Sequence, residues 1–143
     1  MRDLVLTQEA RAARNAASIA RADEGPGNSA IKLYTAQGGT LVAVRQLGKP
    51  CGSVREADGR MVLVPGAQND LVLATGAANW GEWCAGDGVA LYVGPVTDEH
   101  GMASDGAGGL VDTGDVGPWV LEGTRGTQLY EGGLVLLRSA AIG

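Results

Sequence analysis

Few residues in this sequence are of types that act in catalysis or metal binding, and His100 is the only histidine. It follows Asp98 and Glu99 in the run "TDEH". A Ser/His/Asp triad needs more partners than this, and zinc sites commonly use several histidines or cysteines. Three consecutive side chains on an extended backbone also cannot all point at one ion. We therefore expect this run to be the solvated tip of a loop.

Glu82 lies between Trp80 and Trp83, an arrangement found in some carbohydrate sites. Glycoside hydrolysis needs two carboxyl groups facing each other, and strand alternation places Glu82 on the Trp80 side only. The Gly-rich stretches lack the strand-to-helix context of a phosphate-binding loop. Three more acidic residues have a spacing that fits no known calcium loop: Asp105, Asp112 and Asp115. The sequence predicts no catalytic, cofactor-binding or metal-binding residue, and we expect a protein that is not an enzyme.

Trp80 and Trp83 are two of only three tryptophans, and the chain has no phenylalanine. On a strand, residues three positions apart point to opposite faces. One ring is therefore expected in the core. The other is expected at a surface that contacts another protein, because aromatic side chains are enriched in such interfaces. Parity alone does not decide which ring is which.

The composition favours a β protein that does not bind nucleic acid. The chain has 143 residues, 24 of them glycine, and a net charge of −5. So many glycines between short apolar runs indicate short strands and tight turns. The acidic balance disfavours nucleic-acid binding, since a phosphate backbone would be repelled.

Two cysteines, Cys51 and Cys84, are too few for a disulfide framework and are expected to be buried thiols. We see no signal peptide and no run of membrane-spanning length. The sequence thus indicates a protein made in a reducing cytoplasm, with no membrane partner.

An Ala-rich helix is predicted directly after Thr7, which is placed to act as its N-cap, with Glu9 in the first turn. The apolar residues Leu4, Val5 and Leu6 precede it and belong to no amphipathic pattern. They are either an arm that binds a partner, or a first strand or frayed end of the domain.

From residue 30 the hydrophobic period changes to two, with turn signals every 8–12 residues. We predict an N-terminal arm and helix over 1–29 and a β domain over 30–143. The expected fold is all-β, a jelly roll or β-sandwich of about 8–10 short antiparallel strands with one short N-terminal helix.

The order of these segments resembles the jelly-roll cement (decoration) proteins of tailed-bacteriophage capsids. The match runs from about residue 10 to 142 and is carried by four short motifs: Leu33-Tyr34-Thr35, Ala78-Asn79-Trp80, Gly86-Asp87-Gly88 and residues 132–136. The chain departs from the family at Glu82 and in the length of the loop 97–109.

The resemblance implies a homodimer that sits on the outer surface of an icosahedral head, after assembly in the host bacterial cytoplasm. Its partner would be a major capsid protein with the HK97-like fold, and no cofactor, nucleic acid or small-molecule substrate is implied. Two alternatives stay open. One is another phage structural role, in the tail or in head completion. The other is a carbohydrate-binding jelly-roll module that uses Trp80 or Trp83.

Overall fold

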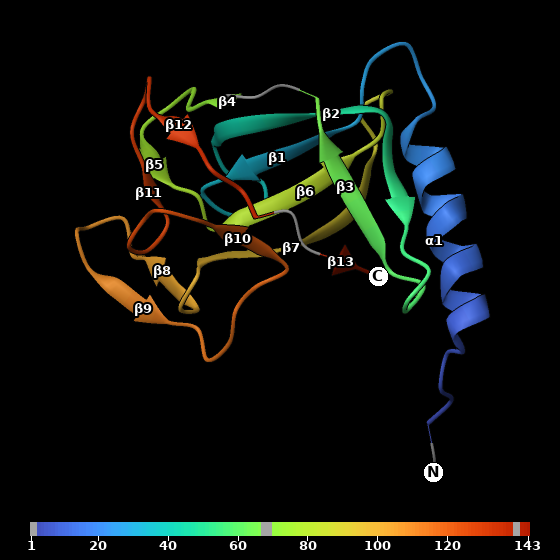
Figure 1. The fold of residues 1–143 in the computed structure, drawn as a ribbon. Helices are drawn as coiled ribbons and strands as arrows, with labels where there is room; N and C mark the ends of the chain where they lie inside the picture. The colour runs from blue at the N-terminus through green and yellow to red at the C-terminus, as the bar shows by residue number, and fades with distance from the viewer. Residues whose placement is uncertain (1–2, 67–69, 139–140) are drawn as a thin grey trace.

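The protein is mostly β, with one helix at its N-terminal end, as the sequence predicted (Figure 1). The computed structural model describes residues 3–66, 70–138 and 141–143. Its elements, in chain order, are α1 (Gln8–Ala22), β1 (Ala30–Tyr34), β2 (Leu41–Val54), β3 (Met61–Pro65), β4 (Asp70–Leu71), β5 (Gly76–Ala77), β6 (Trp80–Cys84), β7 (Ala90–Asp98), β8 (Met102–Ser104), β9 (Leu110–Asp112), β10 (Trp119–Leu121), β11 (Gln128–Leu129), β12 (Leu134–Val135) and β13 (Ala141–Ile142).

Helix α1 begins where the sequence predicted. The side-chain oxygen of Thr7 accepts a hydrogen bond from the backbone N–H of Ala10 at 3.2 Å, which satisfies one of the free donors of the first turn. The helix ends before Asp23, and it buries one stripe made of Asn15, Ile19 and Ala22 against the β body. Packing on this stripe is needed because a lone helix of this length is marginally stable in water.

The main sheet has the order β10-β7-β6-β1-β2-β3-β13. Within it, β1, β2 and β3 follow one another, and β6 returns to pair with β1 on its free side. All three pairings are antiparallel, so the spatial order β6-β1-β2-β3 is that of a Greek key.

Two details of the predicted sheet are wrong. Strand β10 pairs with β7 in parallel, not antiparallel, because residues 99–118 form a long crossover that contains the β8–β9 hairpin. The described residues also form more strands than the 8–10 expected. Five of them, β4, β5, β11, β12 and β13, have only two residues each. Two residues are too few to leave a period-two signal in a sequence.

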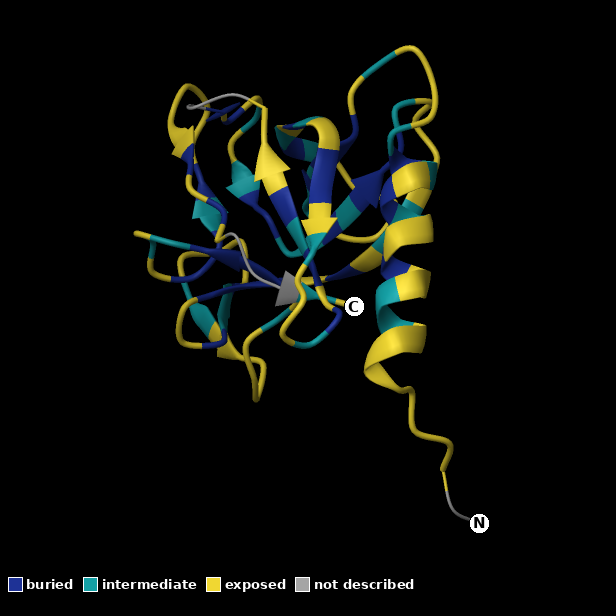
Figure 2. Cartoon of the chain, turned by 45° about the vertical axis from the view of Figure 1, so that its right-hand side comes forward, coloured by how far each residue is buried: buried dark blue, intermediate teal, exposed yellow. Residues whose placement is uncertain are grey.

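The core lies on the inner face of this curled sheet and under α1 (Figure 2). In β1, Ile31 and Leu33 are buried while Lys32 and Tyr34 are partly exposed, as the predicted alternation requires. Trp119 of β10 packs over Gly81 of β6, where an added Cβ would come within 2.3 Å of the Trp119 ring. The glycine thus lets the indole ring approach the sheet and donate a hydrogen bond to the Gly81 carbonyl at 3.1 Å.

A buried ion pair joins the sheet to the strands that cover its end. Arg45 of β2 donates from Nε to Asp70 of β4 at 2.9 Å, and the two side chains are only 10% and 6% exposed. The other guanidinium nitrogens donate to the carbonyls of Leu137 and Val135 at 3.3 and 3.4 Å. One side chain thus holds β4 and the segment of β12 against β2.

Replacing Asp70 by Ala should lower the free energy of unfolding by about 3–5 kcal/mol, because Arg45 would remain charged in the interior without its counter-ion. Urea denaturation followed by tryptophan fluorescence measures this loss. The control is Arg138→Ala, which removes exposed ion pairs with Glu122 and Glu99 and should cost less than about 1 kcal/mol. Equal losses in the two variants would contradict a central role for the buried pair.

Candidate functional site

The apolar segment that precedes α1 is exposed. Leu4 and Val5 are 101% and 88% exposed and Leu6 is 38% exposed, so the first two make almost no contact with the rest of the chain. The segment continues beyond the helix and away from the β body (Figures 1 and 2). Residues 3–7 form neither a strand nor part of the helix, so the first-strand interpretation is wrong and these residues are an exposed, extended end of the domain.

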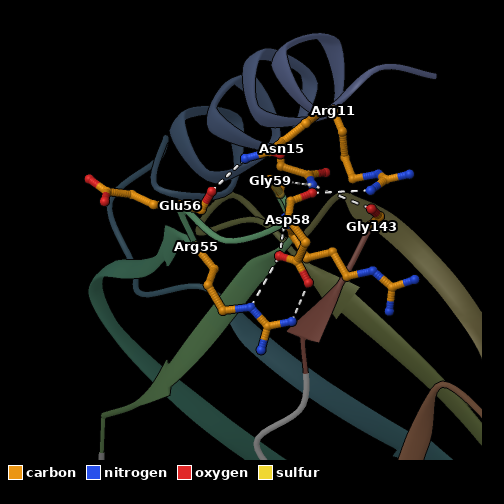
Figure 3. Close-up of polar contacts among 9 residues, drawn as sticks. Arg11, Asn15, Arg55, Glu56, Asp58, Gly59 and Gly143 are labelled. Atoms are coloured by element: carbon orange, nitrogen blue, oxygen red, sulfur yellow. Dashed lines mark hydrogen bonds and ion pairs between the residues drawn. The ribbon is translucent and has the colours of Figure 1, made fainter.

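A row of polar contacts fixes the helix that carries this arm (Figure 3). Side chains on one face of α1 donate to the backbone carbonyls of the turn between β2 and β3: Gln8 to Glu56 at 2.5 Å, Arg11 to Asp58 at 3.1 Å and Asn15 to Gly59 at 2.8 Å. Backbone acceptors in a turn are held in place, so the helix has a defined position on the body.

The turn itself is shaped to receive the helix. Gly59 has φ +74°, and a Cβ there would lie 2.7 Å from the carbonyl oxygen of Gln8. Asp58 accepts from Arg55 and from the backbone N–H of Arg60. The hydrogen bond from Arg55 is the main cause that lowers the pKa of Asp58 to about 2, so this carboxylate is charged over the whole physiological range. The turn therefore keeps one conformation, and it fixes the position of the helix from which the arm extends.

A second apolar surface lies on the strands β4 and β12 and the residues that follow them. We define the leucine face as four side chains that are each 51–55% exposed: Leu71, Leu73, Leu134 and Leu136. Leu71 pairs directly with Leu134 across the two strands. The inward positions between them are buried: Asp70, Val72, Val135 and Leu137. These strands are thus apolar on their outer face and largely apolar on their inner face.

The tryptophan pair divides as parity predicted. Trp83 is fully buried, donates from Nε1 to the hydroxyl of Ser29 at 2.7 Å and meets the ring of Tyr92 edge-on at 5.3 Å between centroids. Trp80 is partly exposed, and its Nε1 donates to Glu82 at 3.1 Å. Trp83 is therefore the core member. Of the two rings, only Trp80 can take part in an interface or stack on a ligand.

The run around His100 differs from the predicted loop tip in one respect. Asp98 is 1% exposed and ends strand β7, whereas Glu99 and His100 are exposed. The Asp98 carboxylate accepts from the backbone N–H groups of His100, Met102 and Gly126 at 2.7–2.9 Å. Burial would raise the pKa of Asp98, but these three donors outweigh it and lower that pKa below its ordinary value. Asp98 is a structural anchor for the loop.

The remaining candidate residues do not come together. Among the described residues no group of His, Cys, Asp and Glu is arranged to hold a metal ion. Three aspartates instead accept backbone N–H groups within their own turns: Asp105, Asp112 and Asp115. Cys51 and Cys84 are buried and not bonded to each other. Burial, with the nearby carboxylate of Asp23, raises the pKa of Cys51 to about 12, so this thiol stays protonated and unreactive.

The sequence analysis missed the leucine face, although a signal for it was present. The segments "DLVL" and "GLVLLR" are continuous in apolar residues, which is typical of strands covered on both faces. The sequence does not say whether the same chain or another one supplies the second cover. In the structure described here, no segment of the same chain does so fully.

Comparison with protein-family models, with curated proteins and with solved structures gives no match to this chain. In the part of the chain that the structure describes, no helix is both long and apolar enough to cross a membrane.

Replacing Trp83 by Ala should lower the free energy of unfolding by about 3–5 kcal/mol, because a large buried ring leaves a cavity that the core cannot fill. Trp80→Ala is the matched comparison and should cost about 1 kcal/mol, since that ring is already partly exposed. Urea denaturation followed by far-UV circular dichroism measures both losses without depending on the tryptophans. A larger loss for Trp80 would reverse the assignment of the two rings.

The Asp98 anchor predicts a pH dependence of stability. The pKa of Asp98 is lowered on folding. The contribution of the charged Asp98 to the free energy of unfolding is therefore complete above the pKa of the unfolded state, about 3.9, and is lost as the pH falls through the pKa of the folded state. Asp98→Asn should melt well below the wild type at pH 7, because the amide has one acceptor oxygen in place of two.

The difference in melting temperature between Asp98→Asn and the wild type should become smaller as the pH falls below about 3.9. Calorimetric melting temperatures from pH 7 to pH 2.5 provide the measurement, and the exposed neighbour Glu99→Gln serves as the control. A gap that is constant with pH would show that the charge of Asp98 is not what holds the loop.

Proposed function

We propose that this protein is a capsid cement protein of a tailed bacteriophage. It binds the outer surface of an icosahedral head and clamps adjacent subunits of a major capsid protein with the HK97-like fold against the pressure of the packaged DNA. The observation that carries the proposal is the exposed apolar arm, Leu4 to Leu6, held out by a helix that is fixed to a rigid β body. The resemblance in segment order supports the same function.

The energetics of such an arm suit a clamp. Fully burying a Leu or Val side chain is worth about 1.5–3 kcal/mol. Two such residues lie on an arm whose helix is already held on the body, so binding does not have to order the helix as well. A ligand that binds the assembled shell and not its loose subunits stabilises the shell by mass action. Many copies, each binding modestly, would reinforce the whole head.

We also propose that the β domain is a jelly roll. The Greek-key order β6-β1-β2-β3 supports this, because jelly rolls are built from two such keys. The curled main sheet and the short pairs that cover its end, β4 with β12 and β5 with β11, are further support.

The test is to mix the purified protein with expanded phage heads that lack their cement protein. Stoichiometric binding and a higher melting temperature of the shell are expected. The variant Leu4→Asn/Val5→Asn should bind about 100-fold more weakly, because about 3 kcal/mol of apolar burial is lost. The matched control Leu4→Val/Val5→Leu keeps the apolar surface and should bind as the wild type does.

Two results would count against this function. If the wild type binds no expanded head, the protein is not a cement protein, and binding to isolated tails or head connectors would favour another phage structural role. If the wild type binds but the Asn variant binds equally well, the arm is not the contact that carries affinity.

A further inference from the structure

We infer that the leucine face is a two-fold contact surface whose occupant is a second copy of this chain. The resemblance already implies a homodimer, so the new element is the surface through which two copies meet, and it is argued from that surface alone. It does not need a capsid, so it can fail while the proposed function stands, and the reverse also holds.

The alternation along these strands is the first argument. Residues 70–73 and 134–137 place every second side chain inward, and all inward positions are buried. Every outward position is leucine and is about half exposed. A strand that faces water on one side ordinarily has polar residues there, and an apolar outer face indicates a second cover.

The second argument is that the leucine face is already formed in a single copy. The β4–β12 pair is held from beneath by the Arg45–Asp70 ion pair and by the guanidinium bonds to the carbonyls of Val135 and Leu137. The neighbouring segment is held by backbone bonds to β2, in which Leu73 and Ala74 donate to Val42. A surface fixed in this way loses little conformational entropy when it is covered.

The area favours a partner with a broad, flat face. Four half-exposed leucines, together with Tyr130, which is 67% exposed and lines the same hollow as Leu134, form an apolar patch comparable with the largest that monomers show, about 300–600 Å². A stable interface needs about 800 Å² on each side, including its polar rim. Three arm residues of a neighbouring copy could not cover such a face.

A second copy meets these requirements because the surface is complementary to itself. Aliphatic side chains need no polar partner, so leucine can pack on leucine across a two-fold axis. The rim of the face also holds one cation and one anion, Arg125 and Glu131, and neither has an ion-pair partner among the described residues. Each copy thus offers both signs, so opposite charges can meet across a two-fold contact.

The chain cannot cover this surface with its own arm. Strands β4 and β12 lie on the side of the molecule away from α1, and the arm leaves the helix in a different direction (Figures 1 and 2). The arm and the leucine face are therefore two separate contact surfaces.

The experiment measures the mass of the full chain in solution, without any capsid, by sedimentation over a concentration series from about 0.1 to 100 µM. The wild type is expected to be a dimer whose dissociation follows mass action. The variant Leu73→Asn/Leu134→Asn should raise the dimer Kd at least about 100-fold, because each copy contributes both lost side chains to the contact. The control is Val64→Asn/Val93→Asn, two exposed valines outside the leucine face, which should leave the Kd unchanged.

Circular dichroism and urea titration of each variant check that it is folded, as expected for outward positions. If the Asn variant is not folded, Leu73→Ala/Leu134→Ala takes its place in the same assay. A wild type that stays monomeric at 100 µM would overturn the inference. So would a folded variant of the leucine face that dimerises as tightly as the wild type.

Discussion

The ion pair between Arg45 and Asp70 is the constraint on which the arrangement of β4 and of residues 134–137 depends. Both groups are nearly excluded from water, so neither can be left without the other. A buried pair of this kind is seldom more stabilising than apolar residues of the same volume. Its value lies in geometry, because the guanidinium also binds two carbonyls of the segment 135–137 and so admits only one position of that segment against β2.

The same ion pair fixes which side chains of these strands face the core and which face solvent. Along a strand, the side chain next to an inward residue must point outward. Asp70 faces Arg45, and Val135, its cross-strand partner, is buried on the same side, so Leu71 and Leu134 must face away from the body. A shift of one residue in this pair would bring the leucines inward and leave Asp70 in water, and Arg45 would lose its counter-ion. The core therefore requires these positions to face outward, but it does not require them to be leucine.

Local signals were enough to predict the local features. The helix start at Thr7, the alternation in β1 and the opposite facing of Trp80 and Trp83 all depend on residues within a few positions of one another, and the structure confirms them. The parallel pairing of β10 with β7 was not predictable in this way, because it joins residues more than twenty positions apart through an irregular crossover.

The burial of Asp98 was missed for a related reason. An aspartate in a polar, Gly-rich run reads as exposed, and the donor that completes its hydrogen bonds, Gly126, lies 28 positions further on. The same limit applies to the leucine face. Its sequence shows two apolar faces, but only the fold shows that the chain covers one of them. Residue patterns thus predicted which faces of a segment have to be covered, and only the tertiary structure shows which other segment covers them.

The two proposed contacts, the arm on the capsid and the leucine face between two copies, together explain how the protein would join capsid subunits. One arm on one copy can contact only one site on a shell, so a monomer could bind a capsid subunit but could not join two. A dimer formed through the leucine face carries two arms, each fixed to its body by α1. Once the first arm is bound, the second meets its site at a high effective concentration, and the two contacts reinforce each other. Dimerisation would therefore be what turns a modest apolar arm into a clamp.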